Sequence, residues 1–127
     1  MTLDYLDKVN GYGDCIVRLF DFDSLQAEKF RQAIQHTIIQ NKKQLDLATL
    51  NFVEGINCTL TLRISDNDIG IISADNKMFF CDLSIGTYSQ MTILLEPFCN
   101  KKSRGHQWLY DIDTLVDLLF SPTGTWQ

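Results

Sequence analysis

The chain has 127 residues, of which 45% are hydrophobic and 21% are charged. These values are typical of one globular domain with a sizeable core, and they argue against disordered and fibrous proteins. The formal net charge of −5 opposes the phosphate backbone of nucleic acids, so we expect no general nucleic-acid binding.

The sequence shows neither a membrane segment nor a secretory leader. Its fully apolar runs are far shorter than the ~20 residues needed to cross a bilayer. The first residues carry Asp4 and Asp7 where a leader has a basic start and an apolar stretch. We therefore expect a cytoplasmic protein without a membrane partner.

The four cysteines lack the spacing of a zinc site or a redox pair. They are Cys15, Cys58, Cys81 and Cys99. Three of them lie in strand-like segments, where a reduced cysteine acts as a small apolar residue. We expect structural thiols.

The N-terminal part of the chain predicts a helix and then a strand. Residues 2–9 are expected to form a short helix that ends at the glycine-rich turn of residues 10–13. Residues 15–22 are rich in β-branched and aromatic side chains, which favours a strand.

A long helix is expected after this strand. Asp23 is a favourable N-cap, and Gln26 occupies the capping-box position. Apolar residues then recur at helical spacing to about Lys43. The predicted apolar stripe consists of Ala27, Phe30, Ile34, Thr37 and Ile38. We interpret residues 45–55 as a connector with buried leucines.

The middle of the chain predicts an antiparallel meander. In residues 56–65, apolar and polar residues alternate without a break, which is typical of a half-buried strand with one polar face. Residues 69–73 and 77–84 also favour strands, and only short turns separate the three segments. Short linkers of this kind predict hairpins between neighbouring antiparallel strands.

Two helices and one strand are expected after the meander. A capping box begins at Thr87, and its helix is expected to end near Pro97. Residues 107–112 favour a strand, and residues 113–120 favour a short helix. The predicted class is therefore α+β in a single domain, residues 1–127. Its antiparallel sheet has the three-strand meander plus one or two further strands, with two to three helices on one face, in the order β-α-β-β-β-α-β-α.

Two strand-to-helix junctions share the pattern Leu, aromatic, Asp, apolar, Asp, hydroxyl, Leu. Residues 19–25 and residues 109–115 carry it. Alternate residues of an extended segment point to one side, so neighbouring strands would gather four carboxylates at one sheet edge. These are Asp21, Asp23, Asp111 and Asp113. Such a cluster would bind a basic partner or hold Mg²⁺; alternatively, each aspartate only caps its own helix.

The first of these junctions, FDFDSL at residues 20–25, resembles motif I of the haloacid dehalogenase-like phosphohydrolases. The resemblance implies a Mg²⁺-dependent hydrolase in which Asp21 is the nucleophile and Asp23 is the acid/base. It also implies a fold of βα units in which the motif follows a buried parallel strand.

A basic segment at residues 101–106 precedes Trp108. Lys101, Lys102 and Arg104 are expected to bind phosphate or an acidic group. The alternative is a solvated surface loop without a ligand.

These observations favour a non-enzymatic protein-interaction or regulatory domain without a cofactor. We expect it to bind, and by binding to neutralise, a basic partner protein. A Mg²⁺-dependent hydrolase that uses Asp21 and Asp23 is the alternative. A small-ligand or phosphate-binding domain that uses the basic segment is the second alternative.

Overall fold

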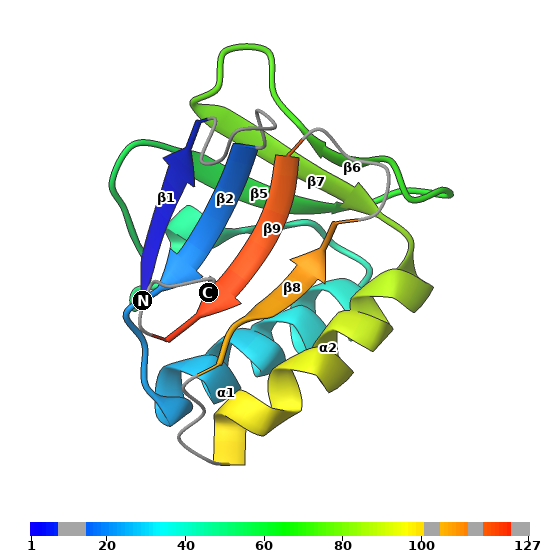
Figure 1. Ribbon diagram of the computed structural model, residues 1–127. Helices are drawn as coiled ribbons and strands as arrows, with labels where there is room; N and C mark the ends of the chain where they lie inside the picture. Colours follow the sequence, from blue (N-terminus) through cyan, green and yellow to red (C-terminus); the bar gives the residue numbers. More distant parts are fainter. Residues whose placement is uncertain (8–14, 101–104, 112–115, 123–127) are drawn as a thin grey trace.

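The computed structural model describes residues 1–7, 15–100, 105–111 and 116–122. These residues form two α-helices and two β-sheets, each with parallel and antiparallel strand pairs (Figure 1). The predicted α+β class is confirmed, whereas the prediction of an antiparallel sheet is wrong. Among the described residues, no helix is both long enough and apolar enough to span a bilayer.

Sheet A has five strands. In hydrogen-bonded order they are β4 (Glu54–Gly55), β1 (Thr2–Leu6), β2 (Cys15–Phe20), β9 (Val116–Ser121) and β8 (Gln107–Tyr110). The central pair, β2 and β9, is parallel, and β1 and β8 flank it as antiparallel neighbours. The sheet therefore joins segments from opposite ends of the sequence.

Sheet B has four strands. In hydrogen-bonded order they are β3 (Leu45–Asp46), β5 (Thr59–Ile64), β7 (Met78–Leu83) and β6 (Gly70–Ile72). β5 and β7 are parallel neighbours, and β6 pairs with the far side of β7. The predicted meander is thus right in its three strands and in the antiparallel pairing of β6 with β7, and wrong in placing β6 beside β5.

The turn after β5 explains this pairing. The Ser65 N–H donates to the Leu83 carbonyl and the Ile69 N–H donates to the Asp82 carbonyl, both at 2.9 Å. These bonds hold the chain against the end of β7, and β3 occupies the other edge of β5, so β6 adds to the far side of β7. The two six-residue strands, β5 and β7, then lie side by side over the core.

Two segments predicted as helices are strands. Residues 2–9 contain β1, where Asp4 is tolerated because it pairs with Arg18 on β2. Residues 113–120 contain most of β9; residues 112–115 lie outside the described residues. A continuous apolar run fits a buried helix and a strand covered on both faces equally well, and β9 is buried on both faces.

The first helix begins where the sequence predicts. α1 (Ser24–Ala33) is capped by Asp23, whose side chain accepts a 2.8 Å hydrogen bond from the Gln26 N–H. It continues into a π-helical segment, η1 (Ile34–Gln40), so the helical rod ends close to Lys43 as expected. Four residues of the predicted stripe are buried: Ala27, Phe30, Ile34 and Ile38.

The second helix, α2 (Ile85–Asn100), begins two residues before the predicted capping box and continues past Pro97. Its first turn is held by Ser84, whose hydroxyl lies 3.3 Å from the Thr87 nitrogen. The proline does not end the helix, because the carbonyl that loses its partner belongs to the exposed Ile93, where water can replace the bond.

Aromatic contacts join the sheets and helices in one core. β5 and β7 of sheet B cross behind sheet A, and α1 and α2 lie side by side below them (Figure 1). Tyr5 of β1 contacts Phe79 of β7, with ring centroids 4.7 Å apart. Phe120 of β9 contacts Phe30 of α1 and Phe98 of α2, at centroid distances of 5.9 and 5.1 Å.

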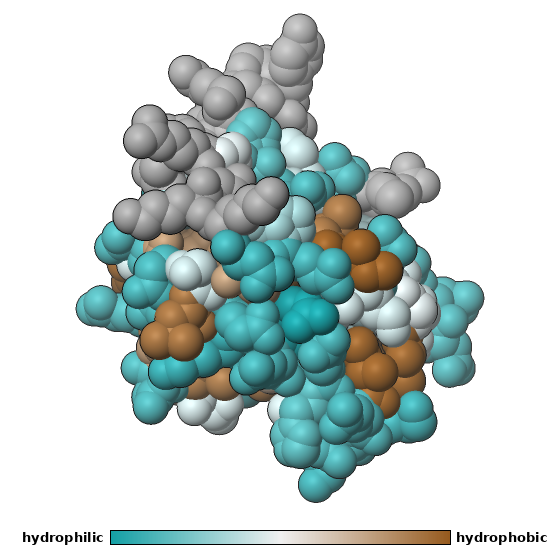
Figure 2. All heavy atoms as spheres, turned by 90° about the horizontal axis from the view of Figure 1, so that it is seen from below, coloured by the Kyte–Doolittle hydropathy of each residue, from teal (hydrophilic) through white to brown (hydrophobic). Residues whose placement is uncertain are grey.

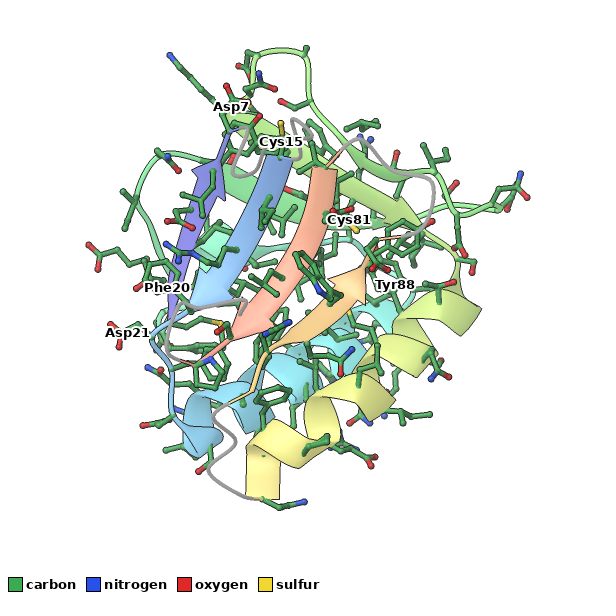
Figure 3. The ribbon with its side chains drawn as sticks, in the orientation of Figure 1. Asp7, Cys15, Phe20, Asp21, Cys81 and Tyr88 are labelled. Carbon is green, nitrogen blue, oxygen red and sulfur yellow. The ribbon has the colours of Figure 1, made fainter. Side chains whose placement is uncertain are left out.

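Tyr88 ties α2 to sheet B. The side chain is fully buried, and its hydroxyl lies 2.7 Å from the Arg63 carbonyl and 2.6 Å from the Cys81 carbonyl (Figure 3). We expect Tyr88→Phe to lower the free energy of unfolding by about 1–2 kcal/mol, because the two carbonyls lose the one hydroxyl donor that they share. Urea unfolding measures this, and an unchanged midpoint would contradict the assigned bonds.

The start of α2 also makes stability depend on pH. Asp68 accepts hydrogen bonds from the Ser84 N–H (2.8 Å) and the Thr87 hydroxyl (2.6 Å), and these bonds hold its pKa below the ordinary value. A carboxyl whose pKa is lower in the folded state stabilises the fold above its unfolded pKa, and this stability is lost as the pH falls through the folded pKa.

We therefore expect Asp68→Asn to destabilise the protein at neutral pH. Solvent screens this exposed carboxylate, so the loss should be under about 1 kcal/mol. Urea titrations of both proteins should show a difference at about pH 7 that shrinks below about pH 4, where the wild-type carboxyl also becomes protonated. A difference independent of pH would contradict this origin.

Candidate functional site

The face of sheet B that is turned away from sheet A is open. Along β5 and β7, the residues that point into the core are buried, and the residues between them are half-buried or exposed. We call the latter the outer face of sheet B; its residues are Thr59, Thr61, Arg63, Ile72, Met78, Phe80 and Asp82.

Apolar side chains occupy the side of this face formed by β7 and the edge strand β6. Met78 exposes 55% of its surface and Ile72 exposes 42%, while Phe80 lies half-buried between them. The strand register places Phe80 opposite Ile72 on one side and opposite Thr61 on the other. A contiguous group of exposed apolar side chains on a regular sheet is typical of a surface that meets another molecule.

A fixed charge pair borders the apolar side chains. Arg63 donates two hydrogen bonds to Asp82, at 2.6 and 2.8 Å, and its guanidinium carbon lies 4.1 Å from the centroid of the Phe80 ring. The bonds to Asp82 raise the pKa of Arg63. The pair is partly solvated, so Arg63 is held in one orientation while part of its guanidinium still faces solvent.

Sheet A carries the same arrangement in a buried setting. Arg18 donates to Asp4 at 3.0 and 2.7 Å, and its guanidinium carbon lies 3.9 Å from the centroid of Phe20. Here both charged side chains are at least 85% buried. On sheet B, Arg63 is 35% exposed while Asp82 is nearly as buried as the sheet A pair, so the arginine is the accessible member of the pair.

The side of the molecule formed by the helices has a different character. Seen from below, it is mainly hydrophilic, and the apolar side chains visible there lie in separate small groups (Figure 2). One exposed apolar residue of α2, Ile93, has nearly the same exposure as Met78, at 54%. Ile93 is therefore a matched control for substitutions of Met78.

A cleft lies where the two sheets meet, at the end of β1 and the start of β2. We call it the Asp7 cleft; it encloses about 320 Å³ and is lined by Tyr5, Asp7, Cys15, Ile71, Ile72, Ser73, Asn76 and Val116. The Cys15 thiol donates to an Asp7 carboxylate oxygen at 3.2 Å, and the two side chains lie side by side in Figure 3. Burial and its hydrogen bond with Cys15 raise the pKa of Tyr5, so its hydroxyl stays neutral.

The aspartates predicted to gather do not lie together. Asp21 follows β2 and Asp111 follows β8, and these strands run in opposite directions on either side of β9. The two residues therefore lie at opposite ends of sheet A, and the predicted cluster is wrong; Asp113 lies outside the described residues. β9 continues sheet A where the sequence predicted a second helix, so the two junctions are not alike.

Asp21 and Asp23 have different local roles. Asp23 caps α1, as the alternative interpretation expected. Asp21 is exposed and has a left-handed backbone (φ 53°), and its N–H donates to the Pro122 carbonyl at 3.1 Å. In residues 1–7, 15–100, 105–111 and 116–122, no three His, Cys, Asp or Glu side chains are grouped to hold a metal ion.

The fold implied by the phosphohydrolase resemblance is wrong. The strand before Asp21, β2, has the antiparallel β1 beside it, and the helix after it leads into the other sheet. A succession of βα units is therefore absent from the described chain. The three basic residues expected to bind phosphate, Lys101, Lys102 and Arg104, lie outside the described residues, and their role stays a prediction.

Comparisons with models of protein families, with curated proteins and with solved structures find no match to this chain.

The sequence predicted only half of the outer face of sheet B. The alternation of residues 56–65 placed Thr59, Thr61 and Arg63 on a polar face, and this is confirmed. In β7 both alternate sets are largely apolar, so alternation could not tell the exposed Met78 from the buried Phe79. Cys15, expected among structural thiols, is half-buried in the Asp7 cleft, whereas Cys58 and Cys81 are buried as expected.

Neighbouring substitutions in β7 test whether the outer face is open. Phe79→Ala should lower the free energy of unfolding by about 3–5 kcal/mol, because Phe79 is almost fully buried. Met78→Ala should change it by less than about 0.5 kcal/mol. Urea unfolding of both variants measures the contrast, and a large loss at Met78 would mean that this face is covered within the molecule.

Proposed function

We propose that this protein is a non-enzymatic binding domain that regulates or neutralises a basic partner protein, with the outer face of sheet B as its main contact surface. The observation that carries the proposal is the row of exposed apolar side chains, Ile72 and Met78 with Phe80 between them, on an open sheet. Isolated exposed residues are common on proteins, whereas a contiguous row needs an explanation.

The composition of this face supports a protein partner. Met, Phe and Arg are enriched at the centres of protein interfaces, and polar residues such as Thr59 and Thr61 are typical of the rim. The Arg63–Asp82 pair is already oriented by its two hydrogen bonds, so little side-chain entropy is lost when a partner contacts it.

The acidic balance supports a basic partner. The net charge of −5 attracts a cationic surface and raises the rate of encounter. Asp21 and Asp23 are exposed beside Leu25, an exposed apolar residue at the start of α1, and they form a second acidic candidate contact. Asp111, at another end of sheet A, and Asp113, outside the described residues, remain predicted contacts. The four free cysteines agree with work in the cytoplasm, where thiols stay reduced.

Capture from an extract of the protein's own cells tests this proposal. We expect wild type and Ile93→Asp to retain a basic protein, and Met78→Asp to lose at least about 30-fold in affinity for it, the size of an interface hot spot. Retention should weaken as salt rises, because the charge attraction is screened. Equal retention by Met78→Asp and Ile93→Asp, with both variants folded, would contradict the proposal.

A further inference from the structure

The Asp7 cleft is continuous with the outer face of sheet B. Ile72 belongs to both, because it is exposed on the sheet and also lines the cleft. A partner that covers Met78 and Ile72 on the outer face of sheet B therefore also contacts the opening of the Asp7 cleft. Ser73 and Asn76, in the turn between β6 and β7, form the polar part of the lining.

The described lining of the cleft carries a negative charge that no cation balances. Asp7 is exposed, and within the part of the chain that the structure describes, Lys, Arg and His side chains form ion pairs only with other carboxylates. Its hydrogen-bond donor in the cleft is neutral, the Cys15 thiol. The carboxylate thus has an acceptor position open to an incoming cation.

The walls of the cleft suit an aliphatic chain. Ile71, Ile72 and Val116 supply apolar surface beside the carboxylate. Lysine and arginine bury their methylene stems along apolar surface while the charged end reaches a polar group. A volume of about 320 Å³ is at the small end of ligand sites, which matches a single side chain and not a large cofactor.

We infer that the Asp7 cleft binds a lysine or arginine side chain of the partner protein that covers the outer face of sheet B. This inference rests on the proposed function. The methylene stem lies along Ile71, Ile72 and Val116, and the cationic group lies against the Asp7 carboxylate. Asp7, which no sequence motif identified, then supplies the charge specificity, and the apolar face supplies most of the contact area.

A pair of small probes tests the cleft without the partner. N-acetyl-lysine methylamide carries the stem and the charge, and N-acetyl-norleucine methylamide carries nearly the same stem without the charge. In amide NMR spectra of the whole chain, the lysine probe should shift the Ile72 and Ser73 signals in a saturable way. The norleucine probe should bind at least threefold more weakly, because it lacks the attraction to Asp7.

Two variants locate the charge that the probe contacts. Asp7→Asn should weaken the lysine probe at least threefold and remove its preference over norleucine. Glu54→Gln changes the charge equally at an exposed position on β4, and it should leave both probes unaffected. Equal binding of the two probes, equal effects of the two variants, or shifts outside the cleft would overturn the inference.

The partner itself separates this inference from the proposed function. If Met78→Asp loses the partner while Asp7→Asn keeps wild-type affinity and salt dependence, the cleft inference fails and the binding face stands. If Met78→Asp keeps the partner, the proposed function fails, and a lysine side chain of that partner no longer explains the cleft.

Alkylation of Cys15, mapped by mass spectrometry, should slow at least fivefold in the complex. An unchanged rate of alkylation counts against binding in the cleft.

Discussion

The packing of Phe120 against three other phenylalanines holds the fold together. Its ring centroid lies 4.1 Å from that of Phe22, and it also contacts Phe30 of α1 and Phe98 of α2. Phe120 belongs to β9, so this cluster attaches both helices to the centre of sheet A. Because β9 pairs with β2, this cluster also connects the two ends of the sequence to the helical layer.

The arrangement of layers follows from this cluster and decides which surface is accessible. The helices cover one end of sheet A, and sheet B covers the other end through contacts such as Tyr5 with Phe79. A sheet that supplies one face to a core leaves its second face to solvent, to another layer or to a partner. In the same Arg–Asp–Phe arrangement, the arginine of sheet B is more exposed than that of sheet A, at 35% against 15%, while both aspartates are largely buried.

The net charge overstates the acidity available to a partner. Asp4 and Asp82 are bound to arginines, and Asp23, Asp68 and Asp75 accept backbone hydrogen bonds. Such carboxylates stabilise turns and helix starts, and each has at least one oxygen engaged in a hydrogen bond within the chain. Asp7 differs because its donor is a thiol, which is a weaker competitor than a cation for a carboxylate oxygen. The Asp7 cleft is therefore the strongest candidate, within the described structure, for binding a cationic side chain of a partner.

The sequence by itself determined the features that depend on near neighbours. The cap at Asp23, the buried stripe of α1 and the alternating faces of β5 were predictable, because capping and periodicity act within a few residues. Only the tertiary structure decided that residues 116–121 form a strand, that β5 lies beside β7, and that Asp21 and Asp111 lie apart. An apolar run satisfies a helix or a doubly covered strand equally well until its neighbours are known. The outer face of sheet B and the Asp7 cleft exist only once segments distant in the sequence have been brought together.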